Sequence, residues 1–295
     1  MARVVTVLAL ICLLNLPAGG QDASAIERGE YIFRASGGCS CHTDVENEGA
    51  FMAGGRAVRT PFGSVYATNI TADSETGIGT WRDADFIRAM RHGIGPDGTR
   101  FFPVFPFTAF TGMSDRDLLD LKAYLFSLPH AERENTVTDL PPPFGWRPLL
   151  GVWSWLYLEP GPYAPDPERE AEWNRGAYLA TALGHCAECH TPRNVMGGLD
   201  IELAYAGTVE GPEGELAPNI TPDPDTGIGR WTTADITWYL RTGLKPDGDD
   251  TQGLMAELID NGYRHMTSSD LEAIAAYLKS LDPIVNRVVA EKPNH

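Results

Sequence analysis

The stretch "CAECH" brings three reactive side chains together. Cys186 and Cys189 are separated by two residues, and His190 follows directly. In an exported chain this pattern is typical of covalent haem attachment: the two thiols add to the haem vinyl groups, and the histidine binds the iron. A redox-active Cys-x-x-Cys would not need the histidine, and zinc would need four ligands at suitable spacing. We therefore predict haem c at this stretch.

The stretch "GGCSCHTD" is the same motif with one residue missing. The matching residues are 147 positions apart up to Cys39 and 148 positions apart at Cys41 and His42, so the deletion lies between the two cysteines. Cys41 and His42 stay adjacent, which predicts one thioether bond and an iron ligand. Cys39 reaches its vinyl group only with backbone strain or not at all, so one thioether and two are both open. A disulfide between these cysteines would also be strained.

The two motifs belong to a repeat that covers the chain. "RGEYIFRASGGC" from Arg28 matches "RGAYLATALGHC" from Arg175, and "NITADSETGIGTW" from Asn69 matches "NITPDPDTGIGRW" from Asn219. Self-similarity at an offset of 147 to 150 residues indicates a tandem duplication of one small domain. The expected organisation is domain 1 at 21–131, a linker at 132–170, domain 2 at 171–284 and a tail at 285–295.

The sequence pattern predicts the same helices in both copies, and no convincing strand pattern occurs. A helix precedes each cysteine motif, a short helix follows each "TGIG" turn, and an amphipathic helix ends each copy. The terminal helices start at N-capping pairs, Ser114 with Asp117 and Thr267 with Asp270. We expect an all-α fold with long loops.

The linker at 132–170 is rich in proline and aromatic residues, so we expect it to be ordered rather than a free tether. Its apolar stretch "LLGVWSWLYL" either packs between the domains or touches a partner or a membrane surface. Packing between the domains is the favoured interpretation.

Residues 1–20 have the features of a secretory signal peptide: the basic Arg3, a short apolar run and a small-residue cleavage site. A membrane anchor is disfavoured because Asn15 and Pro17 interrupt the run. Lipoprotein processing at Cys12 is disfavoured because the bulky Ile11 precedes it. We expect a periplasmic protein without a transmembrane segment after the signal peptide.

The formal net charge of −17 bears on the partners. Binding to nucleic acid needs clustered lysine and arginine, so this class of partner is excluded. An acidic surface favours protein partners with basic patches, or it only keeps the protein soluble.

With these motifs, the chain resembles a known family: bacterial diheme c-type cytochromes built from two class I cytochrome c domains, similar to the cytochrome c subunits of periplasmic or membrane-bound dehydrogenases. The resemblance rests on "CAECHTPRN", on the two "NIT" to "TGIG" segments and on the two "AYL" terminal helices, and it covers essentially the whole mature chain. It implies two haem c groups and electron transfer. The implied redox partners are a dehydrogenase and a terminal acceptor or other cytochrome.

The resemblance also suggests sixth iron ligands. In domain 2, Met255 lies where the family places its axial methionine, whereas Met266 precedes a helix cap, where methionine usually packs. In domain 1, Phe105 stands at the family's methionine position. Met113 is then the next candidate, with a five-coordinate iron or an unexpected ligand as alternatives. Four further residues are expected to pack, lie at the surface or support the site: Met52, Met90, His92 and His185.

Two aromatic and two amide residues are assigned to the haem pockets. Trp81 and Trp231 follow the "TGIG" turns in both copies, so we expect pocket walls with an indole N–H for a propionate; core packing is the alternative. Asn69 and Asn219, at the start of the "NIT" segments, are placed in the same pockets.

Three functions stay open. The first is an exported diheme electron carrier without catalytic side chains of its own. Because Phe105 leaves an iron position open, the second is a haem enzyme acting on peroxide or a small sulfur compound. In the third, domain 1 has lost its haem and is a docking module.

Overall fold

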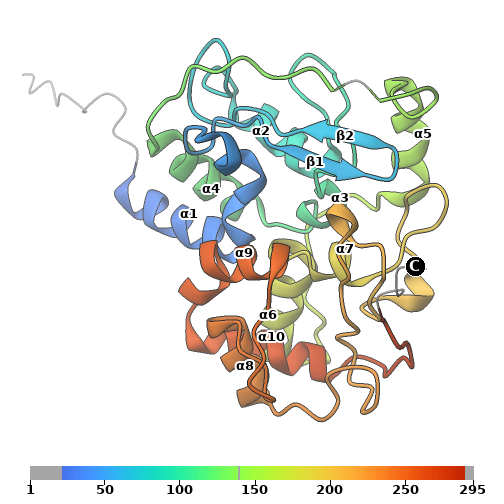
Figure 1. The fold of residues 1–295 in the computed structure, drawn as a ribbon. Helices are drawn as coiled ribbons and strands as arrows, with labels where there is room; N and C mark the ends of the chain where they lie inside the picture. Colours follow the sequence, from blue (N-terminus) through green and yellow to red (C-terminus); the bar gives the residue numbers. More distant parts are fainter. Residues whose placement is uncertain (1–21, 139, 290–295) are drawn as a thin grey trace, which may run out of the picture.

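The computed structural model describes residues 22–138 and 140–289; the predicted signal peptide and the last six residues lie outside this range. The N-terminal half, up to residue 131, contains α1 Ala23–Ala35, η1 Gly37–His42, η2 Val45–Asn47, β1 Ala57–Thr60, β2 Gly63–Tyr66, α2 Asp83–His92, α3 Phe107–Phe110 and α4 Asp115–Ser127 (Figure 1). Helix α5 Arg147–Tyr157 follows. The C-terminal half, from residue 171, contains α6 Ala171–Tyr178, η3 Leu179–Leu183, α7 Cys186–His190, η4 Ile201–Leu203, η5 Pro212–Gly214, α8 Thr233–Thr242, α9 Gly253–Asn261, η6 Tyr263–His265 and α10 Ser268–Lys279.

The first and last helices of each half cross closely. Helix α1 packs on α4, and α6 packs on α10. A Cβ atom added to Gly29 would lie 1.9 Å from the carbonyl oxygen of Asp120, and one added to Gly176 would lie 1.9 Å from that of Ala273. Only glycine therefore permits these crossings, and it occupies equivalent positions in both halves.

The terminal helices begin at the predicted N-caps. The Ser114 hydroxyl accepts the backbone N–H of Asp117 at 3.1 Å, and the Thr267 hydroxyl accepts that of Asp270 at 3.2 Å. Each bond satisfies one N–H that has no partner within its helix. The predicted capping pairs are confirmed.

A small β-hairpin departs from the all-α expectation. Strands β1 and β2 pair antiparallel, with Ala57 opposite Tyr66 and Thr60 opposite Gly63. Each strand has four residues, which is too short for a reliable alternating pattern. The fold is rich in helices, as expected, and the expectation of no strand was wrong at this hairpin.

Helix α5 lies within the predicted linker and contacts both halves. Leu150 and Trp153 form its buried face. The ring of Trp153 lies 6.1 Å from that of Phe107, and its indole N–H donates to the Met196 carbonyl at 2.9 Å. Trp155, on the other face, is 81% exposed. One face packs as the favoured interpretation requires, while the other faces outward.

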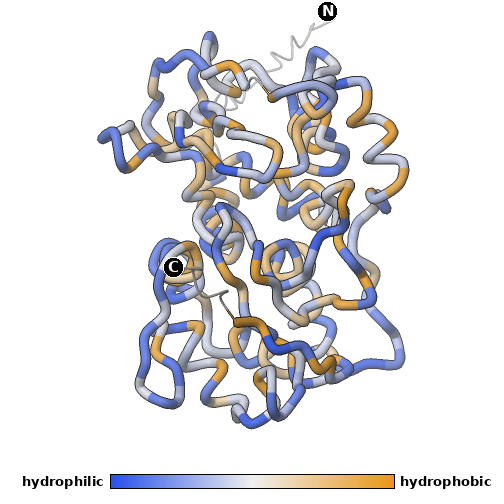
Figure 2. Tube along the Cα trace, turned by 45° about the vertical axis from the view of Figure 1, so that its right-hand side comes forward, coloured by the Kyte–Doolittle hydropathy of each residue, from blue (hydrophilic) through white to orange (hydrophobic). Residues whose placement is uncertain are grey.

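One hydrophobic core continues through both halves. Its buried members include Phe33, Leu118 and Leu121 of the N-terminal half and Leu183 and Leu271 of the C-terminal half. Hydrophilic and hydrophobic residues alternate along the trace in both halves (Figure 2). Within residues 22–138 and 140–289, no helix is long and apolar enough to cross a bilayer.

Candidate functional site

The two motif histidines are held in the same way in both halves. Nδ1 of His42 lies 2.7 Å from the carbonyl oxygen of Thr68, and Nδ1 of His190 lies 2.7 Å from that of Pro218. A carbonyl only accepts, so each ring carries its proton on Nδ1 and keeps the Nε2 lone pair free. Burial lowers the pKa of both imidazoles, which favours the neutral form that binds a metal.

Asn69 and Asn219 fix the loops that carry these two carbonyls. Oδ1 of Asn69 accepts the N–H of Thr71 at 2.9 Å, and its Nδ2 donates to Thr76 at 3.0 Å and to the Ala131 carbonyl at 2.6 Å. Asn219 makes the matching bonds in the other half. Both amides are engaged by the chain itself. The asparagines therefore act on the histidines indirectly, by holding the loops whose carbonyls accept from the imidazoles, whereas the prediction placed them in the haem pockets.

Four free thiols belong to the two motifs: Cys39, Cys41, Cys186 and Cys189. Burial raises the pKa of Cys39, Cys186 and Cys189 to about 12 and also raises the pKa of Cys41. A redox-active Cys-x-x-Cys has a thiol of lowered pKa. The desolvated thiols of this chain differ from that pattern.

The shortened motif has an unusual backbone. Gly37, Gly38 and Cys39 are consecutive left-handed residues, with φ of 77°, 74° and 47°. In the full motif only His185, at φ 39°, precedes a regular helical turn. The missing residue is thus compensated by a tight turn entered through two glycines. Only Cys39 among the three carries a side chain, so the backbone strain falls on that cysteine.

In the C-terminal half, the two candidate methionines differ in setting. Met255 lies in the first turn of α9, half-buried against the core. Met266 is 2% exposed, precedes the cap residue Thr267, and its carbonyl accepts from Arg241 at 3.2 Å. Met266 therefore has the packed environment that its position before the cap predicts.

In the N-terminal half, Met113 repeats the setting of Met266. It is fully buried, and its carbonyl accepts from Arg91 at 2.8 Å. Phe105 packs against Phe110, with ring centroids 5.7 Å apart. Three further residues are buried or half-buried in this half: Met52, Met90 and His92.

The two tryptophans follow turns of the same geometry. The backbone N–H of Trp81 donates to the Ile78 carbonyl at 3.0 Å, and the backbone N–H of Trp231 donates to the Ile228 carbonyl at 2.9 Å. Both side chains are half-buried against the core, and Trp231 packs edge-on to Tyr239 at 5.4 Å. Pocket wall and core packing are both compatible with this placement.

The shortened motif is covered by a helix of the other half. A Cβ atom on Gly37 would lie 2.4 Å from Cδ2 of Leu258, and one on Gly38 would lie 2.9 Å from Cβ of Asn261. Both partners belong to α9, which lies beside α1 in Figure 1. The two glycines thus serve a close approach between the halves as well as the tight turn.

The full motif is covered reciprocally by α3 of the N-terminal half. Thr108 donates to the carboxylate of Glu188, inside the motif, at 2.6 Å. The rings of Phe110 and His185 meet edge to face at 5.4 Å. Each motif is therefore covered by an element of the opposite half, and both lie at the junction of the halves.

An ion-pair cluster closes the same junction. Arg56 donates to Glu257 at 2.6 Å and to Glu213 at 3.2 Å, and both acids belong to the opposite half. A role for Arg56, Glu188 or His185 in this junction was not predicted from the sequence. The acidic residue inside "CAECH" was the visible signal: Glu188 pairs locally with Arg193, and the fold adds Thr108 of the opposite half.

The described part of the chain has no cluster of side chains suited to zinc. There, no group of three or more His, Cys, Asp or Glu side chains is arranged to hold a metal ion. Haem c differs because it needs two thiols and one or two axial groups. The donors around both motifs fit haem c.

Comparison with known proteins gives relatives along almost the whole chain. A nicotinate dehydrogenase subunit of Pseudomonas putida is 41% identical over 271 residues, which cover 90% of this chain and 22% of that protein. The fructose dehydrogenase cytochrome subunit of Gluconobacter japonicus is 38% identical over 267 residues, covering 90% of this chain and 54% of that protein. A diheme cytochrome c-type of Cereibacter sphaeroides is 40% identical over 266 residues, covering 87% of this chain and 86% of that protein. The chain thus spans about a fifth and about half of the first two relatives. No family model matches the chain.

Proposed function

Because this chain belongs to a family of bacterial c-type cytochromes that includes a diheme cytochrome and the cytochrome subunits of dehydrogenases, we propose that it is an exported diheme electron carrier. It accepts electrons from a partner dehydrogenase and delivers them to a second redox protein. Export rests on the predicted signal peptide, and the acceptor is inferred from the need of any carrier for one.

One observation supports this function most directly. His42 and His190 each donate from Nδ1 to a backbone carbonyl at 2.7 Å, and each lies beside free thiols. This second hydrogen bond fixes ring orientation and tautomer, as it does for metal-bound histidines in general. Each half then acts as one cytochrome c domain.

Each half would hold haem c with its own set of residues. In the C-terminal half, Cys186 and Cys189 would form the thioether bonds, and His190 and Met255 would bind the iron. In the N-terminal half, the set would be Cys41, His42 and, as the two weaker assignments, Cys39 and Met113. Haem c, when bound, supplies one-electron redox chemistry.

The protein residues provide placement rather than acid–base catalysis. Burial desolvates the thiols and imidazoles, and the same enclosure would limit access of water. The loop bonds of Asn69 and Asn219 hold the carbonyls to which the histidines donate. Contacts of α3 and α9 with the opposite motif keep the two sites close, which favours electron exchange between them.

Intact mass tests the number of haems. The mature protein, made in a host with cytochrome c maturation and then denatured, should carry two covalent haem increments. A His190→Ala variant should keep its thioether bonds but lose the low-spin spectrum of that site. One increment in the wild type would mean that only "CAECH" is loaded, and the two-haem relay would have to be abandoned.

Phe105 supports a second candidate, a haem enzyme with an open iron position in the N-terminal half. Its side chain packs among phenylalanines and cannot ligate iron. A resting spectrum with a high-spin band that shifts on adding cyanide would favour this enzyme. A low-spin spectrum indifferent to cyanide would eliminate it.

A further inference from the structure

A tyrosine of the N-terminal half completes the start of a helix in the other half. Tyr31, in α1, donates its hydroxyl proton to Oδ2 of Asp270 at 2.5 Å. The same hydroxyl accepts the backbone N–H of Thr267 at 3.2 Å. Thr267 is the N-cap of α10, and Asp270 is its third residue. The hydroxyl thus links two groups at one helix start.

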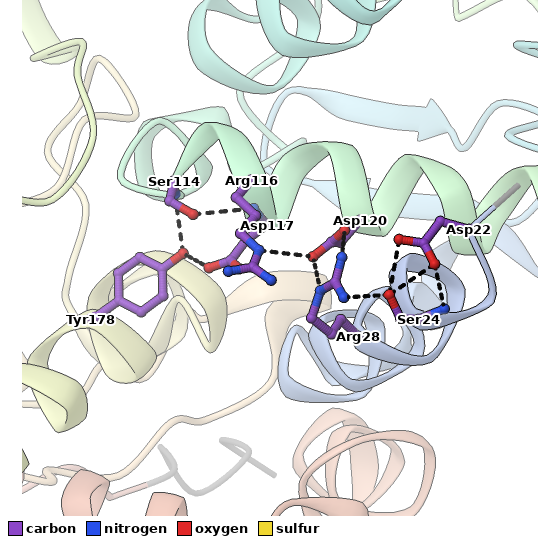
Figure 3. Close-up of polar contacts among 8 residues, drawn as sticks. All are labelled: Asp22, Ser24, Arg28, Ser114, Arg116, Asp117, Asp120 and Tyr178. Carbon is purple, nitrogen blue, oxygen red and sulfur yellow. Dashed lines mark hydrogen bonds and ion pairs between the residues drawn. The ribbon is translucent and has the colours of Figure 1, made fainter.

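The C-terminal half returns the same contact. Tyr178, at the end of α6, donates to Oδ2 of Asp117 and accepts the backbone N–H of Ser114 at 3.1 Å. Ser114 is the N-cap of α4, and Asp117 is its third residue. Figure 3 shows the Tyr178 side chain reaching from its own helix to both groups on α4. The two contacts are reciprocal, and they use equivalent positions of the repeat.

Helix α8 shows what these caps would otherwise look like. There, Oδ2 of Asp235 accepts the backbone N–H of Thr232 directly, at 2.8 Å, and the capping box is closed within one helix. In α4 and α10 the acid is present at the same position, but a tyrosine hydroxyl of the opposite half stands between N–H and carboxylate. In the docked molecule, each of these two helix starts is therefore completed through a tyrosine of the other half.

The charges strengthen both bonds. Burial and the bond to a carboxylate raise the pKa of Tyr31 and of Tyr178, so the proton stays on the phenol. Burial acts to raise the pKa of Asp270, but the bonds from Arg175 and Tyr31 outweigh it and the pKa is lowered. A neutral donor facing a charged acceptor makes a strong, charge-assisted hydrogen bond.

The docked orientation also sets the distance between the two haem motifs. Leu258 of α9 lies against Gly37 beside the shortened motif. On the other side, Thr108 of α3 binds Glu188 within the full motif. Rotation of one half against the other would break these contacts and change the distance between the two motifs. The tyrosine caps are placed to resist that rotation.

We propose that Tyr31 and Tyr178 are positioning residues that lock the two halves in the orientation that brings the haem motifs together. In the exchange between the motifs, one electron leaves one site and enters the other, and no bond forms or breaks. The dependence of this exchange on the lock rests on the proposed carrier function. The lock itself does not.

Three variants of the haem-loaded protein test the proposal: Tyr31→Phe, Tyr178→Phe and the double variant, each of which removes only hydroxyl oxygens. In Tyr31→Phe, hydrogen exchange at the Thr267 amide should accelerate about tenfold or more, because that amide loses its acceptor. Tyr178→Phe should have the same effect on the Ser114 amide. In the double variant, the rate of electron exchange after flash reduction should fall about tenfold or more, with midpoint potentials unchanged.

Tyr239→Phe is the matched control. Its hydroxyl donates to Thr251 at 3.1 Å within the C-terminal half, so neither readout should change. A double variant with wild-type amide exchange and a wild-type electron exchange rate would overturn the proposal. If the wild-type protein showed no electron exchange between two haems, the carrier function would fail, and unchanged amide exchange in the double variant would then overturn the lock.

Discussion

At the scale of single residues, the asparagines behind the two motif histidines each make several side-chain hydrogen bonds that hold their loops. Asn219 is 3% exposed, and its amide bonds to Thr221, Thr226 and the Ile284 carbonyl. Asn219→Ala would leave these groups unpaired in a buried loop. We expect a loss of about 2–4 kcal/mol in the free energy of unfolding, measured by urea denaturation of the haem-loaded protein.

A shift of the midpoint potential should accompany this loss, because the loop carries the Pro218 carbonyl that binds His190. Asn47→Ala is the control: this exposed side chain binds only Asp44, so we expect a change within about 0.5 kcal/mol. A destabilised Asn219→Ala protein with an unchanged potential would show that the loop bonds do not orient the histidine.

The two cysteines of the shortened motif should differ in importance. Cys41 directly precedes His42, the proposed iron ligand, whereas Cys39 has a left-handed φ of 47°. Cys41→Ser should therefore abolish covalent loading of the N-terminal half. Cys39→Ser should leave the mass increment of the denatured protein unchanged. Loss of the increment in Cys39→Ser alone would reverse this assignment.

At the scale of elements, the helix crossings define each half. Gly29→Ala would place a Cβ 1.9 Å from the Asp120 carbonyl and force α1 away from α4. We expect a destabilisation of about 3 kcal/mol or more, although alanine favours an isolated helix by up to about 1 kcal/mol. Gly151→Ala in α5 is the control, because its Cβ would meet only the flexible Arg100 side chain at 3.3 Å.

Thermal unfolding followed by circular dichroism compares the two variants. Gly151→Ala should match the wild type within about 1 kcal/mol or exceed it. If Gly29→Ala behaved in the same way, the crossing would not depend on glycine, and the repeated glycine would need another explanation.

Elements with strong local signals were predictable, and elements set by distant contacts were not. Ser114 and Thr267 were recognised as caps because their partners lie three residues away in the chain. The hairpin of β1 and β2 was missed because each strand has only four residues. The motif cysteines and histidines were proposed as site residues from their spacing alone. The Thr68 carbonyl behind His42 could not be proposed in this way, because it lies 26 residues further along the chain.

At the scale of the whole molecule, the repeat predicts two similar halves but does not predict how they dock. The shared core, the Arg56 cluster and the tyrosine caps all join residues far apart in the sequence. Tyr31 and Tyr178 occupy matching positions in the repeated segments that start at Arg28 and Arg175, and nothing in those segments indicates a contact between the halves. Their hydroxyls gain partners only in the docked molecule, so one sequence without its fold could not assign them.

Acid should weaken this docking in a defined pH range. The pKa of Asp270 is lowered in the folded protein, since the bonds from Arg175 and Tyr31 outweigh its burial. A carboxyl with a lowered folded pKa stabilises the protein above its unfolded pKa of about 3.9, and the contribution disappears as the pH falls through the folded value. The free energy of unfolding of Asp270→Asn should therefore lie about 2 kcal/mol or more below the wild type at pH 7.

This difference should shrink steadily below about pH 4 in urea denaturation series, because the wild-type carboxylate then takes up a proton and loses its advantage over the amide. Asp249→Asn is the matched control, since Asp249 is exposed and pairs only with Lys245 at the surface, where solvent screens the pair. A gap between Asp270→Asn and wild type that stayed constant down to about pH 3 would mean that the charge of Asp270 contributes nothing. The bonds to Tyr31 and Arg175 would then act through shape alone.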